Sequence, residues 1–170
     1  MNADQLRAMQ APVKEKYKTE PAAALVTLKA KGSLGDGITC KVDTGRALAE
    51  AGLHPATGGD GLSLCSGDML LEALVACAGV TLKAVSTAIG VSLGEKTVVR
   101  AEGDLDFRGT LGVSREAPIG FQTIRLFFDL QTDASTEQQA SLMKLTERYC
   151  VVYQTLKQAN NISTTPHAEQ

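Results

Sequence analysis

The sequence predicts a single α+β domain, and three observations support this fold class. Two pairs of strand-like segments are each joined by a turn or a glycine-containing link, so each pair is expected to be antiparallel. A long apolar helix is predicted between the two pairs, and a further helix is predicted at either end of the chain. The length of 170 residues suits one domain, with an N-terminal helical extension (1–21), a core (22–160) and a polar tail (161–170).

The first predicted helix covers residues 3–18. Asn2 can cap its first turn, and Gln5, three residues later, completes a capping box. Pro12 lies inside this segment and lacks the N–H group that a helix interior needs. It therefore either breaks the helix or opens a second short one.

Two strands are predicted next, at residues 23–30 and 38–42. The dipeptide Asp36-Gly37 lies between them and is a typical hairpin signal. Residues 44–67 are rich in glycine and predict a long connection, with a helical turn at 46–51.

The clearest helix covers residues 68–89. Ser66 is expected as its N-cap, and Gly90 is a natural stop at its C-terminus. The helix is apolar on nearly every side, so we expect it to be buried all round. A chain of this size offers too little surface to cover such a helix, which predicts a homodimer that shares the central helices. Four small residues would let another helix approach closely: Ala73, Ala76, Ala78 and Gly79.

Two more strands are predicted at residues 96–105 and 119–130, joined by a glycine-containing segment into a long hairpin. The last helix is predicted at 136–160, where Ser135 and Gln138 form a capping box. Its apolar stripe has helical spacing and consists of Leu142, Leu145, Tyr149, Val152 and Leu156.

The composition is that of an ordinary globular protein. Hydrophobic residues make up 44% and charged residues 21%, which excludes disordered and collagen-like chains. With 17 basic and 19 acidic residues the net charge is −2, so no basic surface for nucleic acid is expected. Four Phe and three Tyr, with no Trp, are too few to suggest a base-stacking platform.

The first residues lack the basic start and the apolar core of a signal peptide. No uninterrupted run of about twenty apolar residues is present, so no membrane partner is expected. We therefore expect a cytoplasmic protein, in which cysteines remain free thiols. The chain has no C-x-x-C pair and two isolated histidines, so no metal site is predicted.

Two of the four cysteines are candidates for chemistry. Cys77 lies near the middle of the long apolar helix and is either a small core residue or a reactive thiol. It is about ten residues from the helix start, too far for the helix dipole to lower its pKa, so a reactive thiolate would need a cation from another segment. Cys150 lies on the last helix and is either a core-edge residue or a second thiol. The sequence does not show whether the two meet.

The other two cysteines are weaker candidates. Cys40 alternates with apolar neighbours on its strand, so we expect it in the core. Cys65 precedes the long helix and is either a third thiol near a reactive site or an incidental loop cysteine. A hydrolase built on Cys77 and His54 is not favoured, because no orienting group or oxyanion hole is marked.

Two motifs resemble the OsmC/Ohr family. One is Leu74-Val75-Ala76-Cys77 inside a long apolar helix, and the other, 73 residues later, is Cys150-Val151-Val152-Tyr153-Gln154-Thr155-Leu156. The predicted hairpin and the glycine-rich approach to the long helix also fit, and the resemblance covers about residues 22–160. The segment Gln10-Ala11-Pro12-Val13-Lys14 looks like an extension found in one branch of the family.

The resemblance implies antiparallel sheets wrapped around long central helices in an intertwined homodimer, with active sites at the subunit interface. It also implies a thiol peroxidase that reduces organic hydroperoxides to alcohols in the oxidative stress response. Cys77 matches the peroxidatic cysteine, which becomes a sulfenic acid, and Cys150 matches the resolving cysteine. No bound cofactor is expected. An external dithiol, of the lipoyl type in the best-known members, reduces the resulting disulfide.

The chain departs from the family pattern around the thiol. The family has a glutamate ten residues before the cysteine, where this chain has Gly67. Asp68 either takes over this catalytic role or is an ordinary first-turn carboxylate. The proline that follows the family's resolving cysteine is Val151 here, and the family's arginine is absent from 22–45. The nearest cations are Lys29, Lys31 and Arg46.

These departures leave a second interpretation open. In it, the same dimer binds a small ligand or acts as a stress protein with weak or no catalysis. The sequence therefore predicts the two thiols and the fold, with turnover and ligand binding as alternatives.

Overall fold

The computed structural model describes residues 2–20, 31–34, 39–43, 48–112 and 114–166, and their side chains except at 13, 16, 18, 31–34, 39–43 and 48. The helices are α1 (Ala3–Thr19), α2 (Ser66–Ile89), α3 (Phe107–Thr110), α4 (Thr136–Tyr149) and α5 (Val151–Lys157), with a 3₁₀ turn η2 (Pro55–Thr57). The strands are β1 (Lys31–Leu34), β2 (Thr39–Asp43), β3 (Leu48–Gly52), β4 (Leu64–Cys65), β5 (Val98–Leu105) and β6 (Phe121–Asp129). The α+β class is confirmed.

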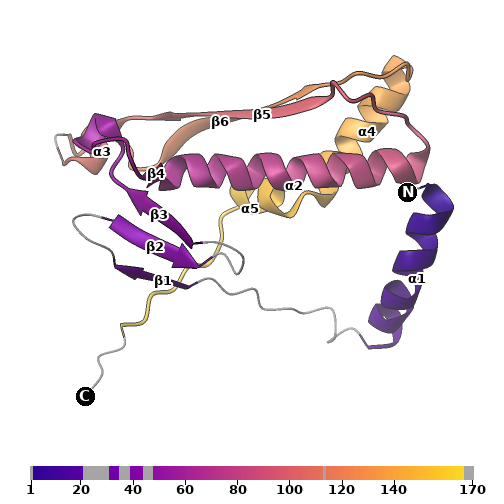
Figure 1. The fold of residues 1–170 in the computed structure, drawn as a ribbon, viewed down its shortest axis with the longest axis horizontal. Coiled ribbons are helices and arrows are strands. Elements are labelled where there is room, and N and C mark those ends of the chain that lie inside the picture. The colour runs from indigo at the N-terminus through magenta and orange to yellow at the C-terminus, as the bar shows by residue number, and fades with distance from the viewer. Residues whose placement is uncertain (1, 21–30, 35–38, 44–47, 113, 167–170) are drawn as a thin grey trace.

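Helix α2 runs through the middle of the molecule and contacts β5, α4, α5 and α1 (Figure 1). The antiparallel hairpin β5–β6 lies along one side of α2. A separate four-stranded sheet has the order β1-β2-β3-β4 and approaches α2 through β4. Helix α2 is therefore the central element on which the other elements pack, and the candidate site lies against it.

The first sheet differs from its prediction. Strands β1 and β2 are antiparallel as expected of a hairpin, whereas the predicted strand at 23–30 and the turn at 35–38 lie outside the described residues. The predicted helical turn at 46–51 is wrong, because Leu48–Gly52 forms strand β3. Its residues favour a helix locally, but five register pairs with β2 override that preference.

Helix α2 begins at Ser66, two residues before the predicted start, so its N-cap is Cys65 and not Ser66, and Cys65 makes no side-chain capping bond. Gly90 ends the helix with a positive φ of 74°, and its N–H donates to the Ser86 carbonyl. By length and composition, α2 is also apolar enough to cross a membrane. Its packing against β5 and α4 is equally typical of a core helix.

Only one stripe of α2 is buried within the chain, so the prediction of a helix buried all round is wrong for the single chain. The buried stripe consists of Leu74, Ala78, Leu82, Val85 and Ser86. On the opposite face Ala73 and Ala76 are exposed, and Val80 is 73% exposed. This open apolar face is the largest difference between the expected and the observed helix.

The core lies between α2, α4 and the β5–β6 hairpin. Leu82, Val85, Val91 and Leu142 form the buried cluster, and Phe128 of β6 packs against it. The predicted capping box of Ser135 and Gln138 is confirmed at the start of α4.

The predicted last helix at 136–160 is interrupted. Cys150 has φ −74° and ψ 108°, an extended conformation, so α4 ends at Tyr149 and α5 begins at Val151. The predicted apolar stripe is correspondingly broken, and Tyr149 is exposed.

Helix α1 is continuous, so Pro12 neither breaks the helix nor opens a second one. Asn2 and Gln5 form the expected reciprocal capping bonds, both 2.9 Å long. Leu6 is the buried contact of this helix, which packs near the C-terminal end of α2 (Figure 1).

Candidate functional site

The interruption at Cys150 places this residue against α2, beside Cys77. The two thiols are close enough for the Cys150 thiol, as a hydrogen-bond donor, to lower the pKa of Cys77, and neither cysteine is part of a disulfide. Cys150 is 1% exposed, and Cys77 is partly buried. The structure thus brings together the two sulfur atoms that the sequence singled out.

The surroundings of Cys77 favour its thiolate. Burial by itself raises the pKa of Cys77. The backbone N–H of Val152, the Cys150 thiol and the backbone N–H of Val151 oppose burial, because each donates a hydrogen bond toward the sulfur. The net result is a pKa of Cys77 below the ordinary thiol value of 9.0.

Thr81 also lies next to this sulfur and lowers the pKa of Cys77 slightly. Its hydroxyl donates to the Cys77 carbonyl oxygen at 2.8 Å. A hydroxyl has one hydrogen, so Thr81 can serve either the carbonyl or the sulfur but not both. We therefore assign the main stabilisation of the thiolate to the backbone N–H groups and to Cys150.

Cys150 shows the opposite behaviour. Burial is the main reason that the pKa of Cys150 lies above 9.0, and the N–H of Tyr153 only partly offsets it. The hydrogen bond to Cys77 and the negative charge that develops there raise the pKa of Cys150 further. Cys77 is therefore the thiol that ionises first, while Cys150 keeps its proton and donates it.

The contacts that lower the pKa of Cys77 come from uncharged groups in the part of the chain that the structure describes. The sequence argument required a cation, because it did not anticipate backbone donors from α5. Of the cations considered there, Lys29 and Arg46 lie outside the described residues, as does the side chain of Lys31.

Asp68 and Cys65 do not reach Cys77 of the same chain. They precede it by nine and twelve residues on or at the start of α2, which corresponds to about 13 Å and 18 Å along the helix axis. Both border a separate cavity of about 360 Å³, together with His54 and Phe121. A disulfide between Cys65 and Cys77 within one chain is excluded by this separation.

His54 is also distant from the dithiol. It caps the 3₁₀ turn η2, where its Nδ1 accepts the N–H of Ala56 at 3.0 Å, and its ring stacks on Phe107. It borders the cavity near the start of α2, so no pairing of His54 with Cys77 is formed. Within the described residues there is also no cluster of three His, Cys, Asp or Glu side chains that could hold a metal ion.

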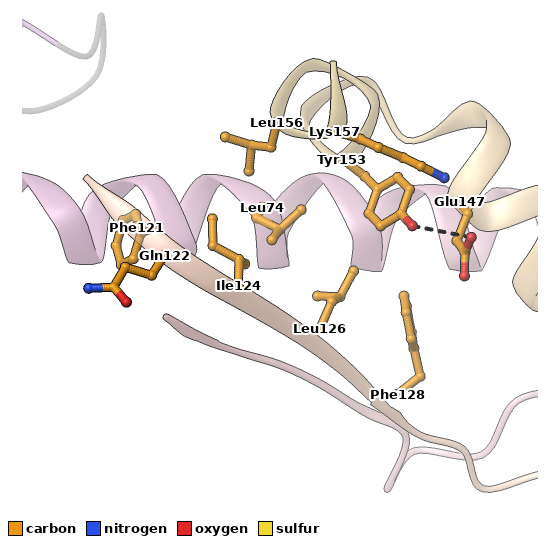
Figure 2. A pocket seen from close by; sticks show the side chains of 10 residues that line it. All are labelled: Leu74, Phe121, Gln122, Ile124, Leu126, Phe128, Glu147, Tyr153, Leu156 and Lys157. Carbon is orange, nitrogen blue, oxygen red and sulfur yellow. Dashed lines mark hydrogen bonds between the residues drawn. The ribbon is translucent and has the colours of Figure 1, made fainter. Parts of the chain in front are cut away.

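A larger cavity of about 520 Å³ lies between α2, β6 and the α4–α5 segment (Figure 2). Its apolar wall is formed by Leu74, Phe121, Ile124, Leu126, Phe128 and Leu156. Its polar edge carries Lys157 and the hydrogen bond from the Tyr153 hydroxyl to Glu147, 3.3 Å long. Neither Cys77 nor Cys150 lines this cavity, and it comes near them through Leu74, less than one helical turn before Cys77, and through Tyr153, which follows Val152.

Sequence reasoning missed the cavity residues and the backbone donors. Tyr153 belongs to the quoted motif, but its hydrogen bond and its place at the cavity could not be read from spacing. The N–H groups of Val151 and Val152 carry no side-chain signature. These N–H groups are free only because the helix breaks at Cys150. Residues 146–156 contain neither Gly nor Pro, so the sequence gives no sign of that break.

Comparison with known proteins identifies the family. The family model described as OsmC-like protein matches residues 58–165, more than half of the chain. No curated protein matches the chain significantly.

Solved structures share the fold. An OsmC-like protein from Mycoplasma pneumoniae superposes with a TM-score of 0.65 at 14% identity, over 78% of this chain and 88% of that chain. An organic hydroperoxide resistance protein from Legionella pneumophila gives 0.62 at 17% identity, over 79% and 91%. The organic hydroperoxide resistance protein OhrB of Bacillus subtilis gives 0.54 at 17% identity, over 79% and 93%. At such identities the likeness shows the fold.

Proposed function

This chain belongs to the family of OsmC-like proteins, and from that premise we propose that it is a thiol peroxidase that reduces organic hydroperoxides to alcohols. The observation that carries the proposal is the contact between Cys77, with its lowered pKa, and the proton-bearing thiol of Cys150. Two proteins of the same fold are named for organic hydroperoxide resistance, which supports this choice of oxidant.

In the first step the Cys77 thiolate attacks the terminal oxygen of the hydroperoxide. The O–O bond breaks, an S–O bond forms, and the remaining alkoxide leaves as the alcohol after taking a proton. Cys77 is oxidised to a sulfenic acid, and the hydroperoxide is reduced by two electrons. The N–H groups of Val151 and Val152 hold the thiolate in place before the attack.

In the second step Cys150 attacks the sulfenic sulfur of Cys77. An S–S bond forms, and the sulfenic oxygen leaves as water with the Cys150 proton. An external dithiol in the cytoplasm, of the lipoyl type, then reduces the disulfide by thiol exchange and is itself oxidised to a disulfide. The organic part of the substrate occupies the apolar cavity lined by Leu74 and Phe128.

The proposal includes an intertwined homodimer in which a second copy covers the open face of α2. What supports it is the exposed apolar stripe of Ala73, Ala76 and Val80 on a helix whose other side is core. Small side chains on this stripe permit close approach of another helix.

The test is a coupled assay of organic hydroperoxide reduction with a dithiol reductant. Cys77→Ser is expected to lower turnover at least about a thousandfold, because it removes the nucleophile. Cys150→Ser should leave a sulfenic acid that dimedone traps. Cys65→Ser is the matched control, since this thiol lies about 18 Å away along α2 and should not change turnover.

A wild-type protein that does not reduce cumene hydroperoxide, or a Cys77→Ser variant with wild-type turnover, would contradict the proposal. The first outcome would favour the second candidate, an OsmC-like protein that binds a small apolar ligand without turnover. The observation behind this candidate is the 520 Å³ cavity beside a dithiol that uncharged groups stabilise within the described chain. A fluorescent apolar probe displaced from the cavity would then measure binding.

A further inference from the structure

The interruption at Cys150 changes the hydrogen bonds of the helix in a specific way. In a continuous helix the Val151 N–H would donate to the Glu147 carbonyl, and the Val152 N–H to the Arg148 carbonyl. Neither bond is among those that cross the interruption here, and both N–H groups instead contribute to lowering the pKa of Cys77. The backbone bonds that span the interruption run from Cys150 N–H to the Thr146 carbonyl and from Gln154 N–H to the Cys150 carbonyl, each 3.0 Å long.

The Glu147 carbonyl, which receives no hydrogen bond from the Val151 N–H, has another donor. The side-chain amide of Gln154 donates to the Glu147 carbonyl oxygen at 2.8 Å, across seven residues. The Gln154 Oε1 in turn accepts the side-chain amide of Gln158 at 3.2 Å, which orients the donor. Gln154 thus replaces the ladder bond that the interruption removes.

The alternative to the interrupted geometry is the continuous helix. Residues 146–156 contain no proline or glycine, so the local sequence itself does not forbid continuity. If the Glu147 carbonyl were free, the Val151 N–H could satisfy it and resume the ladder. A carbonyl without a hydrogen-bond donor also raises the free energy of the folded state, which further favours the continuous helix. Gln154 satisfies this carbonyl in the interrupted geometry and so removes the cost that would otherwise favour a return of the Val151 N–H to it.

We propose that Gln154 is a positioning residue for the dithiol: by occupying the Glu147 carbonyl, it keeps α4 and α5 apart at Cys150 and leaves the Val151 and Val152 N–H groups free to face Cys77. This role builds on the proposed peroxidase, since it concerns the same thiols. It acts on the reduced protein before any oxidant binds, so it can be tested without turnover.

The decisive variant is Gln154→Met, which keeps the length and helix propensity of the side chain but cannot donate. The measurement is the pH dependence of Cys77 alkylation by iodoacetamide in the otherwise unmodified chain, with the labelled cysteine identified by mass spectrometry. Loss of one donor to the thiolate is expected to move the midpoint for Cys77 upward by about one pH unit. Gln154→Glu, which cannot donate when ionised, should move it in the same direction.

Gln139→Met is the matched control. Gln139 also donates its amide to a backbone carbonyl at 2.8 Å, that of Ala134 at the other end of α4. Gln139→Met should lower the free energy of unfolding by an amount similar to that of Gln154→Met. It should leave the midpoint pH of Cys77 alkylation unchanged.

A wild-type midpoint for Cys77 in Gln154→Met would overturn the inference, and so would an equal shift in Gln139→Met, which would show a general loss of structure. The upward shift restricted to position 154 would support it. This result is independent of the peroxidase assay: a protein without turnover that still shows the shift contradicts the proposed function and leaves the role of Gln154 standing.

Discussion

Thr146 carries the one described buried side-chain oxygen that has no hydrogen-bond partner. The residue is 1% exposed and lies one helical turn before Cys150, on the face of α4 that packs against α2. A buried hydroxyl without a partner has lost its hydration and gained nothing in return. It is therefore a local weakness in an otherwise apolar contact.

Thr146→Val should raise the free energy of unfolding by about 1 kcal/mol, because valine has the same shape without the hydroxyl. Chemical denaturation measures the change, and Thr146→Ser serves as the control that keeps the hydroxyl but loses a methyl group. If Thr146→Val were destabilising, the hydroxyl would have a partner such as a buried water molecule.

The opposed pKa shifts of the two thiols predict an order of alkylation. At pH values just below 9.0, iodoacetamide should modify Cys77 and spare Cys150, since the pKa of Cys77 is lowered and that of Cys150 is raised. Peptide mapping after short exposures measures the order. Equal rates at the two cysteines would contradict the assignment of Cys77 as the nucleophile.

The sign of the linked stability follows from the same shift. The pKa of Cys77 is lower in the folded state, so its contribution is present above the unfolded pKa and is lost as the pH falls through the folded pKa. The free energy of unfolding of the wild type relative to Cys77→Ser should therefore grow as the pH rises between these two values. Cys150, with its raised pKa, contributes with the opposite sign.

At this scale the sequence was a partial guide. Cys77 and Cys150 could be selected because their type, spacing and helical setting are visible in the residues themselves. The group expected to stabilise the thiolate was a cationic side chain, because side chains can be identified directly from a sequence. The donors found here are the main-chain N–H groups of Val151 and Val152. Every residue except proline has such a group, so the side chains at these positions give no sign of it.

The contact between α2 and α4 is the principal apolar junction between helices. Leu142 of α4 is completely buried and lies in one cluster with Leu82 and Val85 of α2. Leu142→Ala should lower the free energy of unfolding by about 3 kcal/mol, because it leaves a cavity in a packed core. Leu62 is 88% exposed, so Leu62→Ala should change stability by less than about 0.5 kcal/mol. Urea denaturation compares the two, and similar losses would contradict the assigned core.

The elements that were predicted correctly are those whose ends carry a local signal. The capping boxes at Asn2 and Ser135 and the stop at Gly90 each follow from a residue with one dominant conformational preference. Strand β3 and the interruption at Cys150 have no such signal. The first depends on pairing with β2, and the second on contacts with Cys77 and on the Gln154 amide, all of which exist only after the chain has folded.

The molecule as a whole has two contrasting outer faces. The β5–β6 hairpin displays ion pairs, in which Arg125 bridges Glu102 and Asp104 and Arg100 pairs with Asp129. Exposed pairs of this kind add little stability and are compatible with water. The open face of α2 is apolar instead, which makes it the side that a second copy would cover.

Light scattering after size-exclusion chromatography should therefore report twice the 17.9 kDa of the chain. Val80→Asp, which places a charge on the open face of α2, is expected to convert the dimer to a monomer. Leu111→Asp changes an exposed apolar residue outside α2 and should leave the mass unchanged. A monomeric wild type at micromolar concentration would reject the homodimer.

The way in which Cys77 is stabilised bears on how such a protein can diverge. An arginine is lost by a single base change, whereas a peptide group persists through almost any exchange of side chains. Where the family pattern has proline after the second cysteine, this chain has Val151, whose amide hydrogen is one of the groups directed at the sulfur. Exchanges of the side chains at 151 and 152 for anything other than proline would therefore keep both amide hydrogens, so the nucleophile is preserved by the course of the polypeptide itself.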